Sequence, residues 1–323
     1  VITSRADPLL PLSRLRSRGQ MMEIRTDDLR FTVEEAASFL QQGTGLNLSI
    51  KEVATLEGRT EGWIAGLQMA ALSLQGLKAG DERAAFITDF SGSHRYIFDY
   101  LTDEVLRKRP PGTRDFLLQS SILNHLSGPL CNAVTGNEDG QRILEQLDAA
   151  NLFIVPLDNE RRWYRYHHLF ADLLQHSLRS AYPHQVARLH QRASLWFEKQ
   201  NMPLEAIRYA VNGQDWERAA RLVELNGRAW LASSELGHLL HWLQALPRWL
   251  VQARPNLGLF YGWAMALTNQ FDAVEPALQI AQEAFQAALS NPQRMIELGV
   301  DDPQQQAMFR GYLATCCAAL ASS

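Results

Sequence analysis

Apolar residues recur at helical spacing along most of the chain, and proline and glycine separate the periodic segments. The clearest case predicts a helix from about Thr60 to Leu74, whose apolar positions lie three and four residues apart and therefore share one face. Those positions are Trp63, Leu67, Ala70, Ala71 and Leu74. The pattern predicts a mainly α-helical fold.

Two polar signals mark helix starts before this segment. Thr32 precedes Glu35 by three residues, and Ser49 precedes Glu52 by the same spacing. In such a capping box each of the two residues accepts a hydrogen bond from the other's backbone amide at the start of the helix. We therefore expect three short helices in residues 31–94, packed as a small helical bundle.

The segment 95–184 differs because it contains the strongest extended run of the chain. After three predicted helices, the apolar run 152–157 is followed by a polar turn and by residues 161–166, in which charged and aromatic residues alternate. A period of two on both sides of a turn predicts a β-hairpin. Helices, a hairpin and a closing amphipathic helix at about 169–178 together predict a winged-helix domain with one hairpin.

From residue 185 onward the pattern returns to paired helices separated by short polar breaks, such as those at Asn201 and Gly213. Small residues stand where helices would cross, and aromatic residues such as Trp216 and Trp263 would fill the gaps between them. This arrangement is typical of stacked helical hairpins. We expect a TPR-like α-solenoid over residues 185–323, incomplete at its C-terminal end.

Composition and charge narrow the function. The chain has 323 residues, of which 46% are hydrophobic and 20% charged, and its formal net charge is -4. Residues 95–184 carry 10 basic and 11 acidic side chains, so the predicted winged helix lacks the basic surface that phosphate binding requires. Cys131, Cys316 and Cys317 form no paired framework, as expected in a reducing cytosol. No apolar stretch is long enough to span a membrane, and we expect a cytoplasmic protein without membrane contact.

Two kinds of site are excluded by their missing motifs. No Gly-x-x-x-x-Gly-Lys-Ser/Thr sequence occurs, so we do not expect this chain to hydrolyse ATP by itself. His238 and His241 lie one helical turn apart, but no carboxylate or cysteine stands at ligand spacing beside them. We therefore predict no catalytic residues and no metal site.

The first residues predict that the chain is an internal piece of a longer protein. Val1 and Ile2 favour β-structure and run directly into the polar residues Thr3 and Ser4. We interpret them as the end of a core strand whose neighbours lie outside this chain.

Six segments, in their order and spacing, resemble the MalT-like branch of the STAND regulatory ATPases, which are LuxR-family transcriptional activators. Each segment alone is unspecific, whereas the ordered set covers nearly the whole chain. The segments are Ile2–Pro8, Asp28–Ala36, Thr60–Gln68, Phe116–Leu123, Asn151–Phe153 and Trp163–Phe170.

The resemblance implies a domain order and a mechanism. Residues 1–30 would be the remnant of a P-loop nucleotide-binding domain, 31–94 a helical lid, 95–184 the winged helix, and 185–323 a sensor. In this family ATP replaces ADP and a small-molecule or protein inducer binds the sensor. The protein then self-associates and activates transcription through a C-terminal DNA-binding domain, which is absent from this chain.

The resemblance also implies four residues for an ATP or ADP site. Arg5 matches the position of an arginine that senses the γ-phosphate, and a guanidinium can bind two phosphate oxygens at once. The alternative is that Arg5 only closes a strand beside Asp7. Gly62 and Trp63 belong to a nucleotide-facing lid motif, with the indole against adenine and helix-start amides as donors. The alternative is a capped helix that buries a tryptophan.

His167 stands where the hairpin enters the closing helix. The resemblance implies that its ring binds the β-phosphate of ADP, which would stabilise the closed form through a charge-assisted hydrogen bond. The alternative is a structural histidine within the wing.

Two functions of other classes remain open. One is a DNA-binding winged-helix protein with a helical-repeat interaction domain, because the hairpin carries Arg161, Arg162 and Arg165. The other is a plain helical scaffold.

Overall fold

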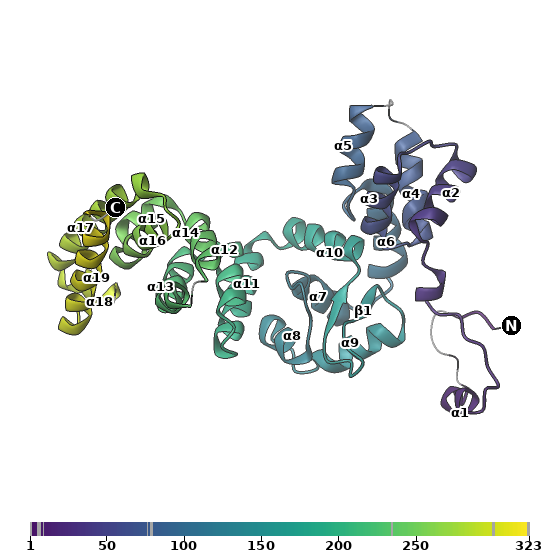
Figure 1. Cartoon of the computed structure of the whole chain (residues 1–323). Coiled ribbons are helices and arrows are strands. Elements are labelled where there is room, and N and C mark those ends of the chain that lie inside the picture. Colours follow the sequence, from purple (N-terminus) through teal and green to yellow (C-terminus); the bar gives the residue numbers. More distant parts are fainter. Residues whose placement is uncertain are drawn as a thin grey trace. The chain divides into compact units, whose positions relative to one another are not determined.

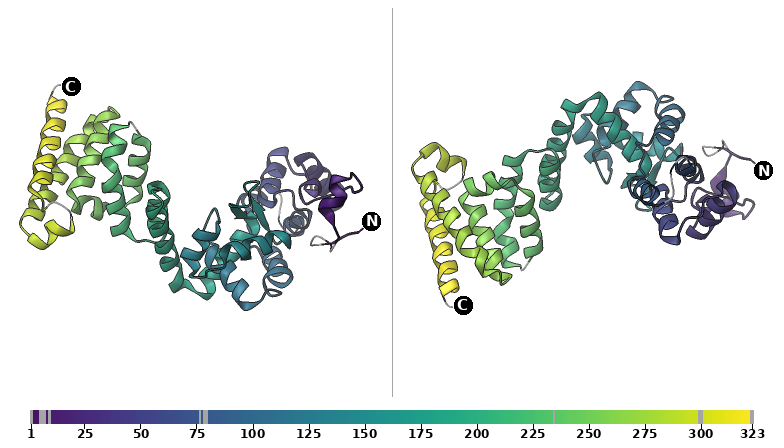
Figure 2. Two further views of the ribbon diagram at one scale, coloured as in Figure 1. Left: turned by 90° about the horizontal axis from the view of Figure 1, so that it is seen from below. Right: turned by 90° about the horizontal axis from the view of Figure 1, so that it is seen from above.

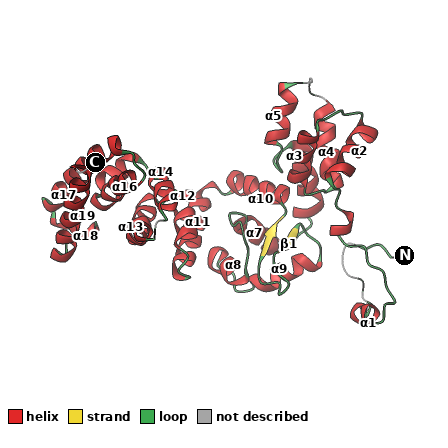
Figure 3. Cartoon of the chain, viewed as in Figure 1, coloured by secondary structure: helices red, strands yellow, loops and turns green. Residues whose placement is uncertain are grey.

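The chain forms two compact units in a computed structural model, residues 1–186 and 187–323 (Figure 1). The structure describes residues 2–4, 8, 10–75, 77, 80–233, 235–298 and 301–321. The described part is mainly helical with one short hairpin, so the predicted fold class is confirmed (Figure 3).

The first thirty residues hold little regular structure. They contain α1 (Leu12–Ser17) and a short 3-10 turn, η1 (Asp27–Leu29). Residues 2–4 form no strand, contrary to the prediction of a strand end, and Val1 and Arg5 lie outside the described residues. Because a strand is stabilised by pairing of its backbone with a neighbouring strand, apolar β-formers alone do not produce one.

The bundle of residues 31–94, which we call the lid, contains four helices among its described residues. They are α2 (Val33–Thr44), α3 (Ile50–Thr60), α4 (Ile64–Gln75) and α5 (Asp81–Asp89). Both predicted capping boxes are confirmed: Thr32 and Glu35 cap α2, and Ser49 and Glu52 cap α3. The bundle buries apolar side chains from its first three helices, namely Ala36, Leu40, Leu56, Leu67 and Leu74.

The predicted start of a helix at Thr60 is wrong. Thr60 is the last residue of α3, and α4 begins only at Ile64. Glu61 and Gly62 between them have positive φ values of 50° and 69°, which break the helix into a tight turn. The apolar positions behind that prediction begin at Trp63, after the turn, so their spacing did not fix where the helix starts.

The next segment begins with α6 (Arg95–Leu101), a π-helical turn η2 (Thr102–Leu106) and α7 (Pro111–Ser120). It continues with α8 (Gly128–Thr135) and α9 (Gly140–Ala149), then strands β1 (Ile154–Pro156) and β2 (Tyr164–Tyr166), and α10 (His168–Ala181). The predicted hairpin is confirmed: its strands are antiparallel, with Ile154 opposite Tyr166. Helix α8 was not predicted, because eight residues show little periodicity.

The core of this winged helix is aromatic. Tyr164, Phe116 and Phe170 are fully buried, and the hydroxyl of Tyr166 lies 2.8 Å from that of Ser120 on α7. A backbone bridge between Leu126 and Tyr164 also ties the hairpin to the segment before α8. These contacts hold β2, and with it the entry to α10, against the helices.

The second unit consists of paired helices (Figure 2). Helix α11 (Pro183–Lys199) leads into α12 (Pro203–Asn212), α13 (Trp216–Ala232), α14 (Leu236–Ala245) and α15 (Arg248–Ala253). The array continues with α16 (Pro255–Leu267), α17 (Phe271–Leu289), α18 (Pro292–Glu297) and α19 (Pro303–Ala321). Helix α12 packs along α13 and α16 along α17, as a stack of hairpins requires.

No helix in the described part of the chain is long and apolar enough to cross a membrane.

Candidate functional site at the contact of lid and winged helix

The carboxylate of Glu61 is one of the groups that join the lid to the winged helix. Glu61, in the turn after α3, accepts hydrogen bonds from both terminal nitrogens of Arg165 on β2, each at 2.8 Å. The side chain of Glu61 is only 7% exposed and that of Arg165 25%. A bidentate pair of this kind fixes orientation as well as distance, because two parallel hydrogen bonds define a plane.

Two further residues bind the same carboxylate. The backbone amide of His168 donates to Oε1 of Glu61 at 3.0 Å, and its ring Nδ1 lies 3.0 Å from that oxygen. Arg30 approaches Oε2 at 3.6 Å. Burial opposes ionisation of Glu61, but the hydrogen bonds from Arg165 and His168 and the nearby charges lower its pKa to about 2. Glu61 is therefore a charged anchor at neutral pH.

His167 faces the lid from the other side of this anchor. Its side chain is buried, and its Nε2 lies 2.9 Å from the carbonyl oxygen of Thr60. A carbonyl can only accept, so Nε2 carries the proton. Burial lowers the pKa of His167 to about 4, although Glu61 and the Thr60 carbonyl favour the charged ring. The ring is neutral at pH 7, and its buried Nδ1 has no hydrogen-bond partner.

Aromatic rings surround His167. The ring of Trp63 packs edge-on against His167 at 6.2 Å between centroids and against Phe153 at 5.1 Å. Tyr100 lies 5.6 Å from Trp63 on another side. Trp63, Tyr100 and Phe153 also line a hollow of about 700 Å³, whose remaining wall comes mainly from the first thirty residues. The half-buried indole thus presents an aromatic surface to a cavity.

Gly62 is required by close packing. A Cβ at this position would lie 2.6 Å from the carbonyl oxygen of Phe31, and the amide of Phe31 donates to the carbonyl of Gly62 at 2.9 Å. The amides of Gly62 and Trp63 donate to Glu57 and Thr60 within the lid. They are turn amides with partners, and not the helix-start donors that the sequence predicted.

The structure therefore brings together three of the four predicted residues, Gly62, Trp63 and His167, in one contact. Arg5 lies outside the described residues. The sequence motifs did not indicate the central pair of Glu61 and Arg165, which stand 104 residues apart. In the sequence, Glu61 is marked only by the glycine that follows it, and Arg165 only by its place between two tyrosines.

The three hairpin arginines are all engaged by acids. Arg165 binds Glu61, Arg161 lies 3.4 Å from Asp148, and Arg162 pairs with Glu160. Their charges are thus compensated within the protein. Among the described residues, no group of three or more His, Cys, Asp or Glu side chains could hold a metal ion.

The described part of the chain thus combines a lid held on a winged helix by a partly buried ion pair with an array of paired helices. The MalT winged helix domain family matches residues 102–186. The chain is MalT-like, and this segment is a MalT winged helix domain.

Similar proteins share nearly the whole chain. It is 35% identical over 298 residues to the serine/threonine-protein kinase PknK of Mycobacterium tuberculosis, which covers 90% of this chain and 27% of the kinase. It is 30% identical over 301 residues to the HTH-type transcriptional regulator MalT of Vibrio parahaemolyticus, covering 93% of this chain and 32% of that protein. It is 33% identical over 286 residues to MalT of Klebsiella pneumoniae, covering 88% of this chain and 31% of that protein. The chain thus spans about a third or less of the length of these relatives.

Proposed function

We propose that this chain is the regulatory segment of an ATP-dependent, LuxR-family transcriptional activator of the STAND type. The observation that carries the proposal is the buried contact of Glu61 with Arg165 beside His167. It gives the winged helix a closed position on the lid, which a ligand can favour or release. Control of transcription as the output is supported by the relatives that are named HTH-type transcriptional regulators.

The nucleotide is ATP or ADP, held by residues of the full protein together with Arg5, Gly62, Trp63 and His167. The aromatic surface of Trp63 suits stacking with a base. The buried Nδ1 of His167 has no hydrogen-bond partner in the protein, so it can bind a phosphate oxygen when the ring is protonated. When bound, the nucleotide supplies phosphate charge. A phosphate beside His167 would favour the protonated ring, so that Nδ1 donates to it while Nε2 keeps its bond to Thr60.

The kinase relative bears on which part of the mechanism resides here. A segment shared by proteins named as a kinase and as transcriptional regulators is the common regulatory part, and the output comes from other regions. In this proposal the helical unit of residues 187–323, TPR-like in its helix pairing, receives a small-molecule or protein inducer. The ATP state then permits self-association, and DNA is bound by a domain outside this chain.

The test uses the intact gene product in its own bacterium. Glu61→Gln keeps the shape of the side chain but removes its charge, so the closed contact weakens and the protein should activate without inducer. Transcript profiling is expected to show one set of transcripts that falls when the gene is deleted and rises in the Glu61→Gln strain. Glu34→Gln, at an exposed lid position, is the matched control and should leave these transcripts unchanged.

A second measurement addresses the nucleotide. The purified intact protein is titrated with a fluorescent ADP analogue, and His167→Ala is expected to weaken binding about tenfold, the loss typical of a charge-assisted hydrogen bond. Absence of any adenine-nucleotide binding would remove ATP dependence from the proposal. Unchanged transcripts in both the deletion and the Glu61→Gln strains would remove transcription.

A further inference from the structure

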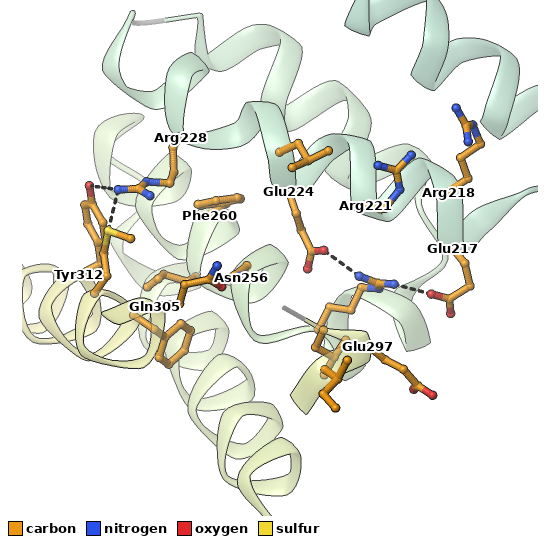
Figure 4. A pocket seen from close by; sticks show the side chains of 17 residues that line it. Glu217, Arg218, Arg221, Glu224, Arg228, Asn256, Phe260, Glu297, Gln305 and Tyr312 are labelled. Atoms are coloured by element: carbon orange, nitrogen blue, oxygen red, sulfur yellow. Dashed lines mark hydrogen bonds and ion pairs between the residues drawn. The ribbon is translucent and has the colours of Figure 1, made fainter. Parts of the chain in front are cut away.

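A cavity of about 620 Å³ lies within the helical unit, far in sequence from the contact of lid and winged helix (Figure 4). Helix α13 supplies one wall, the start of α16 a second, and α18 and α19 the rest. The volume lies in the range of small-molecule sites. Its apolar surface comes from Leu225, Leu259, Phe260, Leu298, Met308 and Phe309.

One polar group in this wall has an unused hydrogen-bonding atom. Glu224 projects from α13 toward the cavity, and its Oε2 accepts a hydrogen bond of 2.7 Å from Arg254 (Figure 4). Its other oxygen, Oε1, is buried and has no partner. Because a carboxylate rotates easily about its last bond, either oxygen can turn toward a ligand. A buried acceptor without a donor is costly, and a ligand that supplied the donor would recover that cost.

The charges around Glu224 indicate which donor fits. Arg254, itself 7% exposed, is shared between Glu224 and Glu217, so one guanidinium faces two carboxylates. Glu297 on α18 adds a third acid to the lining. On α13, Arg218 and Arg221 are both bound by Glu198, whose charge is thereby committed to them.

The remaining lining charge stands at the other end of the cavity. Arg228 contacts the sulfur of Met308 and the hydroxyl of Tyr312, and its guanidinium lies over the Tyr312 ring at 5.5 Å. The lining residues from α19 are uncharged. The lining as a whole has four arginines and three glutamates, but at Arg254 one guanidinium faces the two carboxylates of Glu217 and Glu224. This local pairing favours a positively charged donor over a neutral one at the free oxygen of Glu224.

We propose that this cavity binds a small organic amine, with its ammonium group against the carboxylate of Glu224 and its apolar body over Phe260 and Phe309. The ammonium takes the unpaired oxygen and balances the second carboxylate on Arg254. The apolar body replaces water on the surfaces of α16 and α19. The amine is then the inducer of the sensor, and this last point alone rests on the proposed function.

Protonation offers a signature of the site. Burial raises the pKa of Glu224 to about 7, despite the neighbouring Arg254, so the carboxyl is partly protonated at neutral pH before the ligand binds. The ammonium requires the ionised carboxylate. With a pKa of about 7, the ionised fraction falls about tenfold between pH 8 and pH 6, and amine affinity falls with it. Binding at pH 7 therefore releases about half a proton per bound amine on average.

The experiment titrates the 323-residue chain with primary amines from butylamine to phenethylamine and tryptamine, each beside the alcohol of the same skeleton. Isothermal titration calorimetry at pH 6, 7 and 8 gives the affinities, and two buffers of different ionisation enthalpy give the proton release. At least one amine is expected to bind about tenfold more tightly than its alcohol, and about tenfold more tightly at pH 8 than at pH 6.

Two variants place the site. Glu224→Gln should weaken amine binding about tenfold and abolish the proton release, whereas Glu275→Gln, at an exposed position of α17 outside the lining, should change little. If Glu224→Gln does not fold, the proton release measured when the unaltered chain binds an amine tests the role of Glu224 instead. The proposal is overturned if no amine binds better than its alcohol, or if binding is independent of both pH and Glu224. Amine binding without any change in transcripts would contradict the sensor role alone.

Discussion

Glu61 in the lid and Arg165 on the wing form a bidentate ion pair, with both nitrogen–oxygen distances at 2.8 Å. The pair is partly buried, and the backbone of the following helix also donates to the same carboxylate. Together with the hydrogen bonds of His167 to Thr60 and of Gly92 to Asp172, it holds the lid on the winged helix. Several consequences can be measured.

Removing the guanidinium should destabilise the first unit. In Arg165→Met the buried Glu61 loses its bidentate partner and keeps only His168 and the more distant Arg30. We expect a loss of about 2–3 kcal/mol, below the full cost of a broken buried pair because Arg165 is 25% exposed. Urea unfolding followed by tryptophan fluorescence measures it.

The control for this variant lies three residues earlier. Arg162 pairs with Glu160, and both side chains are well exposed. Such pairs contribute about 0–1 kcal/mol, so Arg162→Met should leave the unfolding midpoint nearly unchanged. Equal effects of the two substitutions would contradict the anchoring role of Glu61.

Acid should weaken the contact through His167 first. Its pKa is about 4 in the folded chain, against an ordinary histidine value of 6.5, so the unfolded chain takes up the proton earlier as pH falls. Stability is thus complete above pH 6.5 and declines as pH falls toward 4, by about 2–3 kcal/mol. The urea midpoint measured from pH 7.5 to 4.5 should follow this slope, and His167→Gln should flatten it. His184→Gln, at an exposed position, should not.

Glu61 contributes to the pH dependence of stability in a lower pH range than His167. Its pKa of about 2 lies below the ordinary glutamate value of 4.5, so its contribution to stability is present above pH 4.5 and is lost as pH falls toward 2. Acid unfolding of Glu61→Gln between pH 4.5 and 2.5 should therefore be less steep than that of the unaltered chain. An identical slope for both would show that Glu61 is not the titrating anchor.

Two glycines, four residues apart, should respond in opposite ways to alanine. Gly62 has a φ of 69° and a backbone oxygen 2.6 Å from the place of a Cβ, so Gly62→Ala should destabilise the lid by about 1–3 kcal/mol. Gly58 lies within α3 with open space around it, so Gly58→Ala should stabilise by about 0.5–1 kcal/mol. Thermal unfolding compares them, and a neutral Gly62→Ala would contradict the turn geometry.

The winged helix should bind DNA poorly in this chain. Arg161, Arg162 and Arg165 are compensated by acids, and counterion release needs cations free to meet phosphate. An electrophoretic shift assay with the 323-residue chain is expected to show no complex tighter than about 1 μM at physiological salt, the tight end of the non-specific range. Tight binding that falls steeply with salt would instead favour a DNA-binding winged helix.

Local patterns in the sequence determined much of this protein. Thr32 with Glu35, and Ser49 with Glu52, marked two helix starts because capping involves residues three apart in the chain. The hairpin followed from alternation, and the paired helices from the spacing of small and aromatic residues. The ordered motifs singled out Gly62, Trp63 and His167, and their role in nucleotide binding stays a prediction.

Tertiary structure alone decided how those elements meet. Thr60 ends one helix instead of starting the next, because the turn at Glu61 and Gly62 is fixed by packing against Phe31. The partner of Arg165 lies 104 residues away, and Arg254, which lies between α15 and α16, binds one oxygen of the buried Glu224 and leaves the other without a partner. Hydrophobic periodicity records which face of a helix is buried, whereas the burial and pairing of a charge depend on what the fold brings beside it.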